Sequence, residues 1–113
     1  MDDRFLQQSK KGALEMLVLE LISQKPSYGY ELLSRLKDAS GGLFALKEGT
    51  LYPILYRLED DGLIEASWQT GEGRSTPKKV YSATDTGKRE NIRRRGIWLN
   101  FSQTIESFYE RKE

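Results

Sequence analysis

The chain has 113 residues, enough for one compact domain, and 37% of them are apolar while 31% are charged. Its 18 Lys and Arg residues almost balance 17 Asp and Glu residues, which excludes a uniformly basic nucleic-acid coat, an acidic tail and the usual composition of a disordered chain. There is no cysteine or histidine, so we expect no disulfide, no metal site, no cofactor and no enzymatic activity. The absence of a long apolar stretch and of a signal-peptide core predicts a cytoplasmic protein.

The first apolar block, from Ala13 to Ile22, has the spacing of a helix face and predicts a helix that ends before Pro26. Lys10 and Lys11 are expected to precede this helix. There they either reach a DNA phosphate or are simply solvated.

A second helix is predicted from Ser27, which is a suitable N-cap, to the flexible connector that begins at Ser40. Its apolar positions again keep helical spacing, at Tyr28, Leu32, Leu33 and Leu36.

The third predicted helix begins at Gly49 or Thr50 and ends at Gly62, a natural C-terminal cap. Pro53 is expected in its first turn, where a missing N–H is tolerated. Its buried stripe is predicted to consist of Leu51, Ile54, Leu55 and Leu58.

After Gly62 the apolar period changes from that of a helix to that of a strand. Ile64, Ala66 and Trp68 alternate with polar residues, and a second alternating segment contains Lys79 and Tyr81. A long polar turn separates the two segments, so we predict a two-stranded hairpin.

Residues 85–113 predict one long helix, capped by Thr84. About 27 residues at 1.5 Å each make a rod of roughly 40 Å, which is too long for one small domain to cover. A coiled-coil-like seam runs along it through Trp98, Phe101, Ile105 and Phe108. The simplest partner for this seam is a second copy of the chain.

This order of elements predicts a mainly α fold with a small two-stranded β-wing. The fold is a winged helix-turn-helix DNA-binding domain over residues 1–83, followed by a dimerisation helix over residues 84–113. Several segments resemble the PadR family of bacterial transcriptional regulators. They are Tyr28-Gly29-Tyr30-Glu31-Leu32, Glu48-Gly49-Thr50-Leu51-Tyr52-Pro53, Arg57-Leu58-Glu59, Asp61-Gly62-Leu63-Ile64, Lys79-Val80-Tyr81 and Ala83-Thr84-Asp85-Thr86-Gly87.

The resemblance implies a homodimer that binds operator DNA, usually as a repressor, and releases it when an effector binds. With one C-terminal helix, the chain resembles the short subfamily. The resemblance also places the recognition surface between Lys47 and Tyr56 of the third helix, a segment that includes Gly49.

With the apolar stripe turned inward, the third helix directs polar and aromatic side chains outward. These candidate DNA contacts are Thr50, Tyr52, Pro53, Tyr56 and Arg57. The alternative for the tyrosines is that they cover the core with their hydroxyls at the surface.

The predicted wing carries Arg74, Lys78 and Lys79, which either contact DNA phosphates or form a solvated hairpin tip. Lys79 has a further alternative, packing its stem against Tyr81. At the start of the second helix, Ser27 and Tyr28 are candidate phosphate contacts.

Tyr30, by contrast, is expected to pack under the first helix.

Trp98 is either a packed seam residue or a platform for a planar aromatic effector at the dimer axis, as in some relatives of the family. Asn91, Arg94 and Arg95 would make such a site polar and cationic, so a polar-edged or anionic aromatic fits best.

The near-neutral total charge conceals a gradient along the chain. Residues 1–62 carry 8 basic and 10 acidic side chains, whereas residues 63–95 carry 8 and 4. The positive charge is therefore concentrated in the wing and the start of the last helix. The sequence favours a dimeric DNA-binding regulator. The alternatives are a winged-helix protein-interaction module without DNA binding, or a sensor of a planar ligand.

Overall fold

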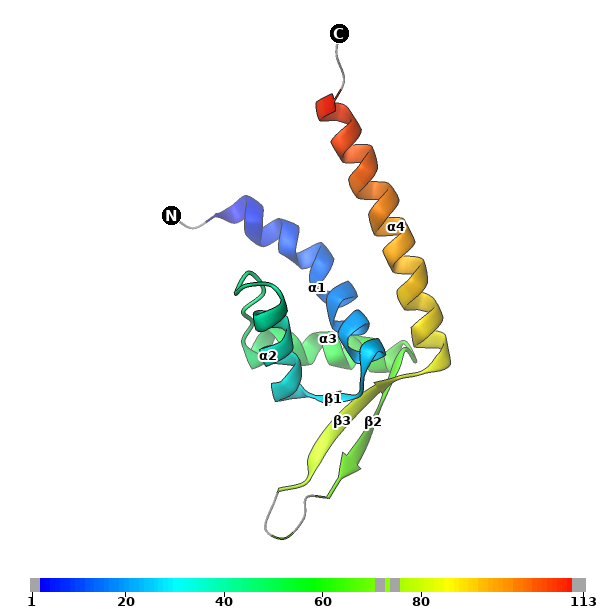
Figure 1. Ribbon diagram of the computed structural model, residues 1–113. Coiled ribbons are helices and arrows are strands. Elements are labelled where there is room, and N and C mark those ends of the chain that lie inside the picture. The colour runs from blue at the N-terminus through cyan, green and yellow to red at the C-terminus, as the bar shows by residue number, and fades with distance from the viewer. Residues whose placement is uncertain (1–2, 71–72, 74–75, 111–113) are drawn as a thin grey trace.

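The computed structural model describes residues 3–70, 73 and 76–110, and within them a mainly helical domain carries a small antiparallel sheet (Figure 1). The elements are α1 (Arg4–Gln24), β1 (Ser27–Tyr28), α2 (Gly29–Ala39), α3 (Glu48–Asp60), β2 (Ile64–Gln69), β3 (Lys78–Ala83) and α4 (Asp85–Glu110). This arrangement confirms the predicted winged-helix architecture with a long last helix.

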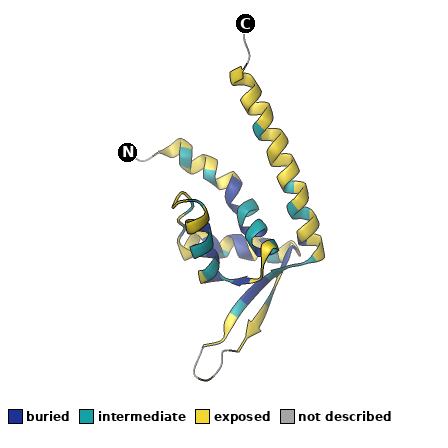
Figure 2. Cartoon of the chain, viewed as in Figure 1, coloured by how far each residue is buried: buried dark blue, intermediate teal, exposed yellow. Residues whose placement is uncertain are grey.

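The hydrophobic core lies where α1, α2 and α3 meet the base of the sheet (Figure 2). The whole predicted stripe of α3 is buried in it, as are Val18 and Leu19 of α1 and Tyr81 of β3. The core therefore holds α3 by one face and leaves its opposite face to solvent.

Helix α1 is longer than its apolar block predicts. It begins at Arg4, where the Asp3 carboxylate accepts a hydrogen bond from the Leu6 N–H at 3.0 Å. Lys10 and Lys11 therefore lie inside the helix, and the expectation that they precede it is wrong. Before Ala13 the helix has only the adjacent apolar residues Phe5 and Leu6, so its first turns carry no apolar periodicity that a sequence reading can detect.

Helix α3 begins one residue before the predicted start, with Lys47 at its N-cap position. Pro53 is consequently the sixth residue of the helix and lies beyond the first turn, contrary to the prediction. At the other end Gly62 has a φ of +73°, its N–H donates to the Glu59 carbonyl, and the Leu63 N–H donates to that of Leu58. This Schellman motif confirms the predicted glycine cap.

The sheet has three strands in the order β1-β3-β2, not the two predicted. The added strand is the short β1, whose Ser27 pairs with Tyr81. Ser27 is fully buried and its Oγ accepts a hydrogen bond from Arg35 at 2.8 Å, so Tyr28 takes the N-cap position of α2 that we predicted for Ser27.

Only Thr84 separates β3 from α4. Its Oγ1 donates to the Gly62 carbonyl at 2.7 Å and accepts from the Gly87 N–H at 3.0 Å, which confirms the predicted cap. The first half of α4 packs beside α1, and the rest projects away from the domain (Figure 1). Within the described residues, no helix is long and apolar enough to cross a membrane.

Candidate nucleic-acid interface

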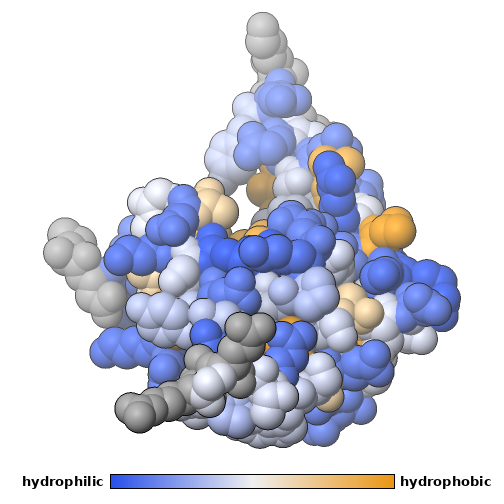
Figure 3. Space-filling view, turned by 60° about the horizontal axis from the view of Figure 1, so that its bottom comes forward, coloured by the Kyte–Doolittle hydropathy of each residue, from blue (hydrophilic) through white to orange (hydrophobic). Residues whose placement is uncertain are grey.

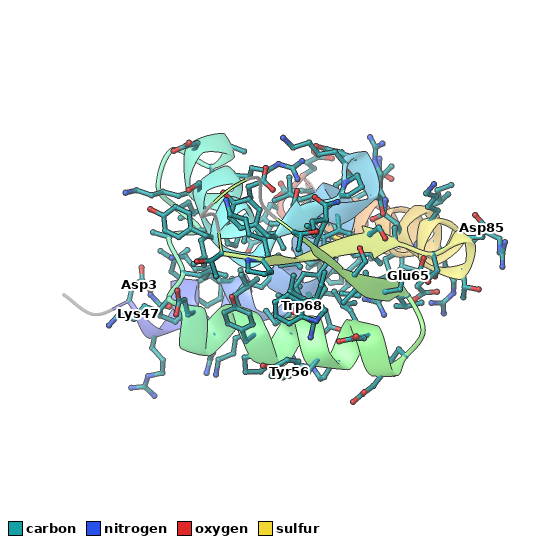
Figure 4. All side chains as sticks on the ribbon, turned by 90° about the horizontal axis from the view of Figure 1, so that it is seen from below. Asp3, Lys47, Tyr56, Glu65, Trp68 and Asp85 are labelled. Carbon is teal, nitrogen blue, oxygen red and sulfur yellow. The ribbon has the colours of Figure 1, made fainter. Side chains whose placement is uncertain are left out.

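The uncovered face of α3 carries most of the residues that the sequence assigns to DNA. The exposed ones are Lys47, Gly49, Thr50, Pro53, Tyr56 and Arg57. Seen from below, Lys47 lies at the start of α3, and Tyr56 lies further along the helix, in the same region as the wing residue Trp68 (Figure 4). The structure thus brings a helix face and a wing to one side of the domain.

The two tyrosines of α3 differ in their surroundings. Tyr56 is 52% exposed, whereas Tyr52 is half-buried with its hydroxyl against Gly29, where a Cβ atom would clash with it. Their ring centroids are 6.3 Å apart. Tyr52 therefore helps to pack α3 against α2, and Tyr56 is the more available of the two for a ligand.

Arg57 has an acidic neighbour that the sequence does not reveal. Its Nε lies 3.4 Å from the Glu15 carboxylate of α1, and the same carboxylate is 3.7 Å from Nη1 of Arg94 in α4. Arg57 is exposed but paired, so a DNA phosphate would compete with Glu15 for it.

Both lysines of the wing lie over tyrosine rings. Nζ of Lys78 is 4.2 Å from the ring centre of Tyr28, and Nζ of Lys79 is 5.5 Å from that of Tyr81. The predicted packing of the Lys79 stem against Tyr81 agrees with this contact. Arg74 lies outside the described residues.

Two contacts at the start of α2 count against the predicted phosphate site there. Ser27 is wrong as a DNA contact, because its side chain is buried and bonded to Arg35. The Tyr28 N–H donates to the Glu31 carboxylate, so an anion already occupies this helix terminus.

Tyr30 also departs from expectation: it is 67% exposed and does not pack under α1. Lys10 is half-buried on α1, and its contact with DNA stays a prediction.

The three candidate effector residues, Asn91, Arg95 and Trp98, line one hollow between α1 and α4. It has a volume of about 390 Å³, and Met16, Leu17 and Glu20 complete its lining. Arg94 is absent from this lining and faces a neighbouring hollow with Glu15.

Glu20 makes the candidate effector hollow less cationic than the sequence suggests. The hydrogen bond that the Asn91 amide donates to its carboxylate lowers the pKa of Glu20, with help from Gln24 and Arg95.

The predicted seam of α4 is largely uncovered in a single chain. Trp98 is 38% exposed and Phe108 is 68% exposed, with Phe101 and Ile105 between them. Trp98 and Phe101 contact each other with ring centres 5.9 Å apart. This apolar face continues the candidate effector hollow along α4.

Sequence reasoning missed Glu15, Glu20 and Trp68 as residues of interest. The two glutamates face partners more than 40 positions away in the chain, so no local pattern could reveal them. Trp68 was visible as the outermost residue of an alternating strand. Within the described residues, no group of three acidic side chains could hold a metal ion.

Comparison with known proteins identifies the family. Residues 18–93 match the model of the transcriptional regulator PadR-like family. The chain is 34% identical over 77 residues to the negative transcriptional regulator PadR of Bacillus subtilis, covering 68% of this chain and 42% of that protein. It is 32% identical over 101 residues to an uncharacterised protein of Lysinibacillus sphaericus, covering 88% and 91% of the two chains.

Solved structures support the same family. A PadR family transcriptional regulator from Eggerthella lenta superposes with a TM-score of 0.85 at 31% identity, over 96% of this chain and 91% of that one. The Bacillus subtilis and Eggerthella lenta proteins are transcriptional regulators, in agreement with the prediction that the chain is not an enzyme. The chain belongs to the PadR-like family of transcriptional regulators.

Proposed function

We propose that the chain is a dimeric, cytoplasmic repressor that binds a near-palindromic operator with α3 and the wing. The observation that carries the proposal is the uncovered outer face of α3, held beside a lysine-bearing wing by a buried inner face. In winged helix-turn-helix proteins such a helix enters the major groove while adjacent elements contact the backbone. The negative regulator of Bacillus subtilis supports the repressor role by similarity.

The apolar face of α4 supports the dimer. A second copy would cover Trp98, Phe101, Ile105 and Phe108, and would place two α3 helices to read half-sites about 34 Å apart. Phe101→Glu should therefore convert the dimer to a monomer, as measured by light scattering after gel filtration, and should reduce operator affinity. An unchanged mass would contradict the proposed interface.

The direct test of DNA binding uses selection from a random duplex library, followed by titration of the recovered sequence. We expect an inverted repeat, and we expect Arg57→Ala with Lys79→Ala to lose DNA retention while the dimer remains intact. If no sequence is preferred, or if the double variant binds normally, the protein-interaction alternative gains support.

We further propose that the hollow lined by Asn91, Arg95 and Trp98 takes a planar aromatic effector. The convergence of these three side chains from two turns of α4 supports this role. In a Trp68→Phe background, Trp98 is the remaining tryptophan of the two in the sequence, so its fluorescence reports the site. Quenching by planar compounds that disappears in Trp98→Ala supports an effector, and no quenching across a broad library contradicts it.

A further inference from the structure

Trp68 is an aromatic residue that its own domain leaves uncovered. Along β2, Ile64 is buried and Ala66 is half-buried, whereas Trp68 on the same face of the strand is 70% exposed. The apolar face of β2 therefore extends beyond the core, with Trp68 at its outer end. An aromatic side chain left in this position contributes little to the stability of the fold, and its ring is available to a ligand.

Trp68 forms one wall of a hollow between the wing and the first turns of α2 and α3. The hollow has a volume of about 310 Å³ and is lined by Tyr28, Gly29, Tyr30, Tyr52, Trp68, Lys78, Lys79 and Tyr81. Among these described residues there are five aromatic rings and two ammonium groups, and none is acidic. The hollow therefore favours an anion that also offers a flat, weakly polar surface.

The lysines are held where they can meet such an anion. The ring contacts of Lys78 with Tyr28 and of Lys79 with Tyr81 keep both ammonium groups close to the lining of the hollow. Tyr81 itself is buried in the core, and this burial raises the pKa of its hydroxyl to about 12. Lysine ammonium and tyrosine hydroxyl groups are common phosphate ligands in protein–DNA complexes.

The position of the hollow selects among possible anions. Its lining comes from the wing and from the starts of α2 and α3, and Trp68 lies near Tyr56 of α3 in the view from below (Figure 4). The underside of the domain is predominantly hydrophilic in the space-filling view (Figure 3). A duplex whose major groove receives α3 must bring its backbone past the wing.

We propose that this hollow binds one sugar–phosphate unit of duplex DNA, with the Trp68 indole against the deoxyribose and Lys78 and Lys79 beside the phosphate. The proposal rests on the proposed function and adds to it a contact that is independent of base sequence. Trp68 thereby supplies affinity rather than specificity, in contrast to the residues of α3.

Two duplexes of equal length test the proposal: the operator selected by the wild-type protein and a random sequence. The wild-type protein serves as the reference for affinity. In the Trp98→Phe protein, which is used only to isolate the signal, Trp68 emission should change when either duplex binds. Trp68→Ala should weaken binding of both duplexes by about a hundredfold, because the dimer loses two interface aromatics at about tenfold each, and should leave their affinity ratio unchanged. Lys79→Gln should reduce the slope of log affinity against log salt concentration by about two, one for each wing of the dimer.

Ser67→Ala is the matched control, because Ser67 precedes Trp68 on the same strand, is exposed, pairs with Val80 and lies on the other face of the strand. It should bind both duplexes as the reference does. Thermal unfolding should show that Trp68→Ala remains folded at the assay temperature.

Normal binding of both duplexes by folded Trp68→Ala would overturn the inference and leave the proposed function intact. A loss confined to the operator would also overturn it, because Trp68 would then be reading bases. If the wild-type protein selects no preferred sequence and binds neither duplex, the proposed function fails together with the inference.

Discussion

Gly87 packs so closely against Leu63 that a Cβ atom on Gly87 would overlap the Leu63 carbonyl oxygen. That carbonyl also accepts a hydrogen bond from the Thr84 N–H at 3.1 Å, so it has little freedom to move away. The contact joins the end of the α3 cap to the first turn of α4.

We therefore expect Gly87→Ala to lower the free energy of unfolding by roughly 2 kcal/mol, the usual cost of forcing an extra carbon into a packed site. Gly96→Ala is the control on the same helix, because an added Cβ there meets nothing within 4 Å. It should raise stability by up to ~1 kcal/mol through helix propensity. Urea unfolding measures both, and equal effects would show that the Gly87 contact is not close.

A substitution at Gly49 should affect DNA binding without lowering the stability of the fold. An added Cβ at this position meets no atom of the chain within 4 Å, so nothing in the fold requires glycine in the first turn of α3. Gly49→Ala should keep or raise the melting temperature while weakening operator binding, because the methyl group would stand between the helix and DNA. An unchanged affinity in a duplex titration would remove Gly49 from the interface.

Glu15 is expected to restrain DNA binding through its ion pair with Arg57. Glu15→Gln should release Arg57 and raise affinity for DNA severalfold, whereas stability should change by less than ~1 kcal/mol because the pair is partly exposed. Glu106→Gln on α4 removes the same charge far from α3 and serves as the control. Equal gains in the two variants would indicate a general charge effect rather than the release of Arg57.

The Glu20–Asn91 hydrogen bond predicts weaker attachment of α4 to α1 in acid. The pKa of Glu20 is lowered in the folded chain, so its stabilising effect is present above the unfolded pKa of about 4.3 and is lost as the pH falls through the folded value. Asn91→Ala should therefore reduce the loss of stability between neutral pH and pH 3. Melting curves across this range check the prediction, and an acid limb as steep as in the wild type would contradict it.

The sequence predicts best those parts of the fold whose pattern is local. The stripe of α3, the cap at Gly62 and the cap at Thr84 each depend on residues within one or two turns, and all are present. Strand β1 was missed because it is two residues long and exists only through its pairing with β3. Ser27 looked like a helix cap for the same reason.

The sequence predicts where the candidate interface lies, but not which residues its side chains contact. The outward face of α3 follows directly from its buried stripe. The glutamate that holds Arg57 comes from α1, and the hollow beneath Trp68 comes from α2, α3 and both wing strands. Such neighbours depend on tertiary packing, which no periodicity encodes.

Because only Thr84 separates β3 from α4, the wing and α4 are expected to move as one rigid unit. The Thr84 side chain makes two hydrogen bonds and Gly87 packs closely against Leu63, so rotation of α4 relative to the wing is restricted. In a dimer joined along α4, any change in the crossing angle of the two helices would then swing the two wings by a corresponding amount. The packing of the two α4 helices against each other would thus set the spacing of the wings, and with it the preferred distance between half-sites on DNA.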